Sequence, residues 1–236
     1  MASGDFLDLA QRAARGARYD PGDTTDITRA KESVNTAYLA SCQGGEQFDF
    51  LEQEGAWVVT GGSDVYAYSS IATAMSITGA TIAEVLAITD DTANTGTVLR
   101  SMDWLSLERL TTSTQDDDPG GEPVWWAKWA SRIRLYPNPD AGYTLGCLVR
   151  LVPAEMSGDT DTPLLPLEYR NSVIVPWAAA DLLRQEGGGE AHNEAQLWQR
   201  QGDNAWQDMR TAHATARKPT FRLKSPEWDR PYWDCV

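Results

Sequence analysis

"GYTLGCLVRLVP", residues 142–153, is the stretch whose pattern sets the fold most clearly. Every second side chain along it can point to the same side of an extended chain: Tyr143, Leu145, Cys147, Val149 and Leu151. Because side chains alternate between the two faces of a strand, this period of two predicts a β-strand with one face packed on a core. The middle of the chain is therefore expected to contain a β region.

Two shorter alternating runs lie just before this strand. "VWWAKWA" (124–130) and "RIRLYP" (132–137) each predict a strand, with Trp125 and Trp129 on one face of the first. These tryptophans are expected to serve the core or the edges of the β region.

Another strand pair and a polar loop are predicted upstream. "AEVLAITDD" (83–91) and "TVLRSMDWL" (97–105) flank a turn at 92–96, and Asp103 can cap a short helix that begins in the second run. The loop at 111–123 is rich in acidic residues and glycine, which cannot bury a surface, so it is expected to lie in solvent, to lie at a subunit edge or to be partly disordered.

"GAWVVTGGSDVYAYSS", residues 55–70, predicts a β-hairpin closed by Gly61 and Gly62. It carries no catalytic group, so it is interpreted as a docking surface for another protein chain. The partner-binding side chains predicted here are Trp57, Tyr66 and Tyr68.

Segments in which apolar residues recur at helical spacing lie on both sides of the β region. The first helix can be capped by Ser3 and the second by the residues at 23–25, while a third begins near Pro166 and should bend at Pro176. A fourth is expected over 190–216. Its predicted packing stripe of mostly small residues is Ala191, Ala195, Trp198, Gly202, Ala205, Met209, Ala212 and Ala216.

This order predicts an α+β fold, an antiparallel bundle of about four main helices with an inserted antiparallel β region. The expected parts are a helix pair at 1–47, the β insertion at 48–160, a second helix pair at 161–217 and an extended C-terminal arm at 218–236.

The arm is proline-broken, aromatic and weakly basic, which is typical of an anchor to another protein. The alternative is that the arm folds back over its own domain. The side chains predicted to bind a partner are Phe221, Arg222, Lys224, Trp228, Arg230, Tyr232 and Trp233.

Composition limits the possible partners. The 236 residues carry a formal charge of −14, and residues 210–236 hold six Lys or Arg against three acids, which leaves −17 on the rest. This acidic part of the chain repels phosphates and is not expected to bind nucleic acid. No apolar run is long enough to span a membrane. Cys42, Cys147 and Cys235 form no paired motif, so reduced thiols are expected rather than disulfides or a zinc site.

Signatures of catalysis are weak. His192 and His213 lie 21 residues apart on one predicted helix and cannot share a site within one subunit. The glycine clusters fit turns and caps rather than phosphate-binding loops, and the acidic run at 116–118 lacks the spacing of a calcium loop. No cofactor or metal is expected, although an enzyme or regulator that uses one of the histidines stays open as an alternative.

Three motifs in order resemble one family, the head-to-tail adaptor (connector) proteins of tailed bacteriophages. They are "FDFLEQEGAWVVTGGSDVYAYSS" (48–70), "RIRLYPNPDAGYTLGCLVRLVP" (132–153) and "TPLLPLEYRNSVIVPWAAADLLRQEG" (162–187). The resemblance spans residues 5–215 and departs from the family at the acidic loop and at Pro176, while the tail beyond Pro219 matches no family motif.

The resemblance implies a structural virion protein without catalytic activity, assembled in the host cytoplasm. Such a protein forms a ring on the portal, most often of twelve subunits, extends the DNA channel and presents a surface to the next neck or tail component. DNA would pass through without sequence-specific binding. Another neck component, a stopper or tail-completion ring, is the alternative within the same structural class.

Overall fold

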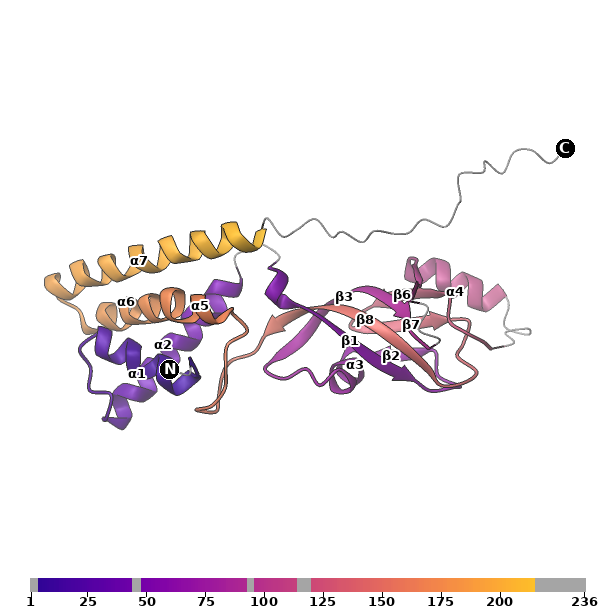
Figure 1. Ribbon diagram of the computed structural model, residues 1–236, viewed down its shortest axis with the longest axis horizontal. Helices are drawn as coiled ribbons and strands as arrows, with labels where there is room; N and C mark the ends of the chain where they lie inside the picture. The colour runs from indigo at the N-terminus through magenta and orange to yellow at the C-terminus, as the bar shows by residue number, and fades with distance from the viewer. Residues whose placement is uncertain (1–3, 44–47, 93–95, 114–119, 215–236) are drawn as a thin grey trace.

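The protein is an elongated mixed α+β molecule in which most helices gather at one end and the β-strands lie at the other (Figure 1). The computed structural model describes residues 4–43, 48–92, 96–113 and 120–214. The arm at 218–236 and the acidic run at 116–118 therefore lie outside the described residues.

The first two helices are α1 (Phe6–Gly16) and α2 (Thr24–Cys42). Asp5 caps α1, since its carboxylate accepts a hydrogen bond from the Asp8 amide at 2.9 Å. The cap is thus Asp5 rather than the predicted Ser3, which lies outside the described residues. Asp23 caps α2 within the predicted range, accepting from the Thr25 and Asp26 amides.

The third predicted helix consists of three segments: α5 (Leu167–Tyr169), the π-helical η2 (Arg170–Ile174) and α6 (Val175–Glu186). Pro176 lies in the first turn of α6. Proline has no N–H to donate to the carbonyl four residues earlier, and its ring collides with that carbonyl. The wider π turn directly before Pro176 is a common way for a helix to accommodate such a break.

The last helix, α7 (Gly189–Ala214), packs on α6, which also contacts α1 and α2. These four helices and η1 (Asp49–Leu51) contribute to one buried core. Ala195, Gly202 and Met209 of the predicted α7 stripe are buried, but Ala212 is exposed. The stripe therefore ends before the last turn of the helix.

Two four-stranded sheets share a second core at the other end of the molecule. Sheet A has the order β1 (Glu52–Val59), β8 (Tyr143–Pro153), β3 (Ala80–Asp90), β4 (Thr97–Val98). Sheet B has the order β2 (Val65–Ala67), β7 (Arg132–Tyr136), β6 (Trp125–Trp129), β5 (Arg100–Ser101).

The strand predicted over 142–153 is confirmed as β8, with β1 and β3 on its two sides. Leu145, Cys147, Val149 and Leu151 are buried as its period of two predicts. The strand pairs are antiparallel except for β5 and β6, which pair in parallel over two residues. The predicted antiparallel β region is confirmed, with this short parallel pair as an exception.

The predicted hairpin at 55–70 is wrong, because β1 and β2 belong to different sheets. All eight residues of β1 pair with β8, β2 pairs with β7, and Tyr68 begins helix α3 (Tyr68–Ala74). The glycines between them pack against another loop: the Gly62 amide donates to the Pro139 carbonyl at 2.8 Å. A Cβ on Gly61 would lie 2.8 Å from the Asp140 carbonyl oxygen, so this contact requires glycine.

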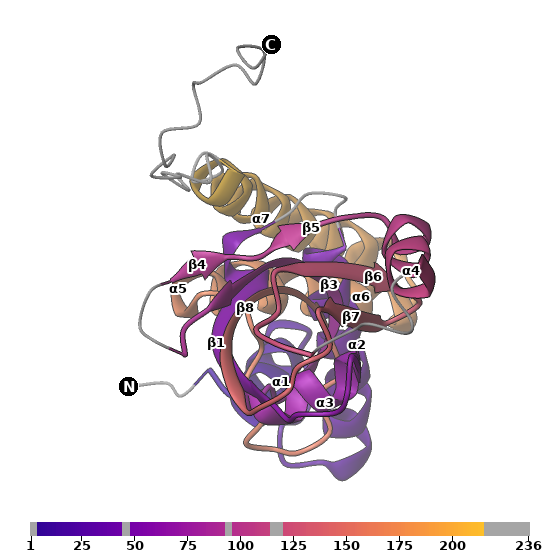
Figure 2. The same cartoon turned by 90° about the vertical axis from the view of Figure 1, so that its right-hand side faces the viewer.

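The other predicted short elements are largely confirmed. Strands β6 and β7 form a hairpin, and β3 pairs with β4 around the predicted turn before the chain crosses to sheet B as β5. Helix α4 (Trp104–Ser113) contacts β6 and lies at the rim of the sheets (Figure 2). Its predicted cap is confirmed, because Asp103 accepts from the Ser106 amide at 2.9 Å.

Candidate partner-binding surfaces

The aromatic residues predicted to dock a partner lie at the inner side of the β region. Trp57 and Tyr68 are 3% and 8% exposed and belong to the core between the sheets. Tyr66 is half-buried, packs edge-on against Trp57 at 5.1 Å between centroids, and donates its hydroxyl to the Ser63 carbonyl at 2.7 Å. Burial raises the pKa of both tyrosines. Tyr66 therefore ties the loop after β1 to Trp57 in the core. A docking role for this region stays a prediction.

All seven predicted partner-binding residues of the arm lie outside the described residues. Helix α7, which precedes the arm in sequence, is tied down near its end: His213 Nδ1 lies 2.5 Å from Asp49 Oδ1 of η1. The imidazole also meets the rings of Phe50 and Tyr169 edge-on. These contacts fix the last described turn of α7 against the start of the β region.

The two histidines are apart, as the sequence predicts. His192 shares a hydrogen bond with Gln196 on the same helix face at 3.0 Å, whereas His213 joins α7 to η1. The position of each histidine is therefore explained by a contact within the fold. Among the described residues, no group of His, Cys, Asp and Glu is arranged to hold a metal ion, and no helix is long and apolar enough to cross a membrane.

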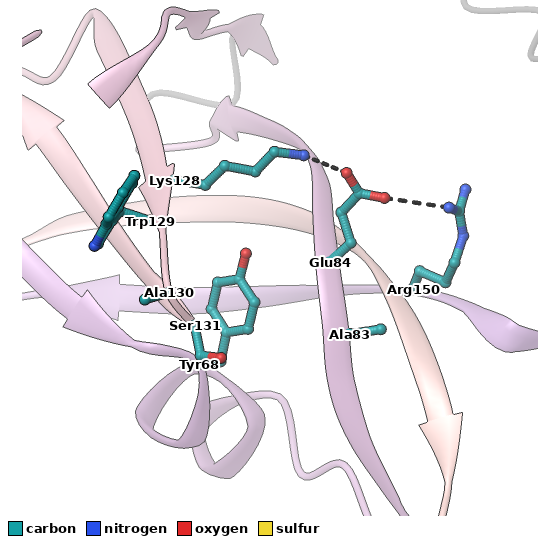
Figure 3. Close-up of a pocket in the computed structure, with 8 residues that line it drawn as sticks. All are labelled: Tyr68, Ala83, Glu84, Lys128, Trp129, Ala130, Ser131 and Arg150. Carbon is teal, nitrogen blue, oxygen red and sulfur yellow. Dashed lines mark hydrogen bonds and ion pairs between the residues drawn. The ribbon is translucent and has the colours of Figure 1, made fainter. Parts of the chain in front are cut away.

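A surface cavity of about 490 Å³ opens where the tip of the β6–β7 hairpin meets β3 (Figure 3). Trp129 lies on its wall and is 61% exposed. The turn that follows, Ala130 and Ser131, has φ values of 44° and 62°. Two successive positive φ values match the tight hairpin turns that normally use Asn or Gly, so here the turn is strained by roughly 1–2 kcal/mol per residue.

A tertiary contact holds this strained turn in place. The amide of Tyr68, the first residue of α3, donates to the Ser131 carbonyl at 2.9 Å. The hairpin tip is therefore fixed by the helix beneath it and presents Trp129 in one position.

A chain of charged side chains crosses the floor of the cavity (Figure 3). Lys128 of β6 pairs with Glu84 of β3, whose other oxygen lies 3.2 Å from Arg150 of β8. Arg150 also reaches Glu52 of β1, at 3.3 Å. The hydrogen bond from Lys128, with the charges of Lys128 and Arg150, lowers the pKa of the Glu84 carboxyl. This chain of ion pairs joins the two sheets.

Sequence reasoning placed Trp129 in the core or at an edge and did not single it out. The available signal was weak: Ala130 and Ser131 separate stretches that end at Trp129 and begin at Arg132, but neither is the Asn or Gly typical of a tight hairpin turn. Exposure of the ring could not be read from that pattern, because both faces of the strand carry large side chains.

No reaction centre is evident among the described residues. The prominent features of this fold are paired strands, packed helices and exposed side chains. A protein-family model described as the SU10 adaptor protein matches residues 5–223. The chain therefore belongs to this family of bacteriophage head-to-tail adaptors, and the resemblance inferred from its motifs is confirmed. No curated protein matches the sequence.

Membership gives the chain its general role. It is a structural protein of the bacteriophage virion, and adaptor proteins of this kind contact the portal and the tail proteins at the neck.

Proposed function

We propose that this adaptor forms a ring beneath the portal, extends the DNA channel and provides the surface to which the tail attaches. The match to the adaptor family carries the proposal, because residues 5–223 include both the helical end and the β end. A ring of twelve copies is proposed from the family resemblance.

The separation of the molecule into two ends supports a role between two partners (Figure 1). Helices α1, α2, α6 and α7 share one core and are proposed to act as a four-helix bundle formed by residues 1–47 and 161–217. The residues at 48–160 would form the inserted β part with its own core. Two separately packed ends offer distinct surfaces, one for the portal and one for the next component.

The acidic surface suits a channel through which DNA moves. A net charge of −14 repels phosphates, whereas a basic bore would bind them by releasing counterions. DNA is therefore proposed to pass without sequence-specific binding, and the acidic loop at 111–123 is proposed to face solvent or a subunit edge.

Two segments are proposed to contact partners. The arm at 218–236 would anchor the chain to the portal or to a neighbour through its aromatic and basic side chains. In the 55–70 segment, Val58 is 64% exposed and would make the contact, while Trp57, Tyr66 and Tyr68 behind it hold the segment in shape.

The decisive experiment combines the full-length chain with the portal protein of the same phage and measures the mass of the complex. A mass equal to the portal plus a ring of this chain is expected, and electron microscopy of virions should place the chain directly under the portal. Virions that lack the chain, or no complex with the portal, would overturn the proposal. A position farther along the axis would instead identify a stopper or tail-completion ring.

A further inference from the structure

We propose that the tip of the β6–β7 hairpin is a contact between copies of this chain, in which Trp129 and Arg132 bind an acidic surface of a second copy. This inference rests on the proposed assembly of several copies. Trp129 and Arg132 belong to neither the arm nor the 55–70 segment, although Tyr68 of that segment lines the same cavity.

The shape of the tip is the first observation that carries the inference. Trp129 is 61% exposed, although a tryptophan has roughly 150–250 Å² of surface that is favourable to bury. The ring borders a cavity of about 490 Å³, so an incoming side chain can pack against it from the cavity side. Exposed tryptophans next to concave surfaces are common anchors of protein interfaces.

Rigidity is the second observation. The turn keeps two non-glycine residues, Ala130 and Ser131, at positive φ, and the Tyr68 amide holds it there. Strained backbone that the surrounding structure fixes tends to occur where a binding geometry must be preset. A preset tip loses little conformational entropy on binding.

Charge selects the second copy as the occupant. The whole chain carries a formal net charge of −14, so most of the surface that one copy presents to another is acidic. Two copies therefore repel each other at long range. At the tip Lys128 and Arg150 are paired with Glu84 and Glu52, whereas Arg132 stands directly opposite Trp129 in the ladder. Within the described residues Arg132 has no ion pair, so its charge is available to a carboxylate of a neighbour.

Photo-cross-linking at position 129 tests which molecule occupies the tip. The full-length chain with benzoylphenylalanine in place of Trp129 would be mixed with an isotopically heavy copy, both alone and in complex with the portal protein. Cross-linked peptides that join a light to a heavy copy are expected, with acidic residues near the attachment point. The same cross-linker at Leu197, a 65% exposed residue of α7, is the matched control and should give at least tenfold less of this product.

Two substitutions measure the strength of the contact. Trp129→Ser and Arg132→Glu should each weaken association between copies at least tenfold, while Leu197→Ser should leave it unchanged. Circular dichroism checks the fold of each variant, which should be kept because these side chains are exposed.

Light–heavy cross-links that are absent both alone and with the portal would overturn the inference, as would cross-links to the portal only or unchanged association of both variants. The proposed function is judged separately, by binding of the wild-type chain to the portal. A portal complex whose copies touch elsewhere would refute the hairpin contact and leave the adaptor role standing.

Discussion

Replacement of Gly202 by alanine should destabilise the protein although alanine is the better helix former. Gly202 is buried on α7 and faces Trp177 of α6. A Cβ at this position would lie 2.3 Å from Trp177 Cδ1 and 2.6 Å from Nε1. Carbon atoms pack at about 3.5–4.0 Å, so the indole or the helix must move by roughly 1 Å or more.

The expected change in the free energy of unfolding combines one stabilising effect and two destabilising ones. Helix propensity favours alanine by about 1 kcal/mol. Overpacking in a core costs about 1–3 kcal/mol. Moving the indole also breaks the hydrogen bond from Trp177 Nε1 to Asp203, which is 3.0 Å long and contributes about 1 kcal/mol. The free energy of unfolding should therefore fall by about 1–3 kcal/mol, which for a chain of this size lowers Tm by roughly 2–12 °C.

Urea and thermal unfolding of the full-length chain would measure this change. Gly189→Ala, in the same helix but with no atom near the added methyl group, is the matched control and should be neutral or slightly stabilising. In a Trp177→Ala background the Gly202→Ala substitution should lose most of its cost. A Gly202→Ala protein as stable as wild type, or a cost independent of Trp177, would refute the close-packing explanation.

Three other predictions concern charge, thiols and the arm. Because Lys128 lowers the pKa of Glu84 in the folded state, ionised Glu84 adds stability above its ordinary pKa of 4.5 and loses this contribution as pH falls through the lower folded value. Glu84→Gln should thus reduce the free energy of unfolding at pH 7 and flatten its decline in acid; unaltered pH curves would contradict this. Burial raises the pKa of Cys42 and Cys147 to about 12, so a thiol reagent at pH 8 should label two fewer cysteines in the native than in the denatured chain. Deletion of 219–236 should keep the helix content by circular dichroism and abolish portal attachment in pull-downs, whereas lost helix content would mean that the arm completes its own domain.

The helices could be predicted closely because their signals are local. Phe6, Leu9, Ala10 and Ala13 recur at helical spacing and are buried in α1, and the caps of α2 and α4 lie at predicted positions. A cap or an apolar stripe involves residues within one or two turns of each other, so the sequence contains the whole interaction. Pro176 was recognised for the same reason, although the sequence could not show that a π turn would accommodate it.

Strand pairing could not be predicted in the same way. The segment 55–70 has two alternating runs and a glycine turn, yet β1 pairs with β8, whose paired residues lie 84 to 98 positions later in the chain. A pairing partner is chosen by how much apolar surface the assembled sheets bury, and that depends on strands far apart in sequence. Trp57 and Tyr68 became core residues for this reason, and Trp129 was left outside.

By itself the sequence determined where most helices and strands form, the acidic character of the chain and, through the order of its motifs, its membership of the adaptor family. Only the tertiary structure decided which strands pair, which aromatic rings are buried and which one stands exposed at a rigid tip. Secondary structure and charge depend on neighbouring residues and composition, whereas burial depends on which distant surfaces meet.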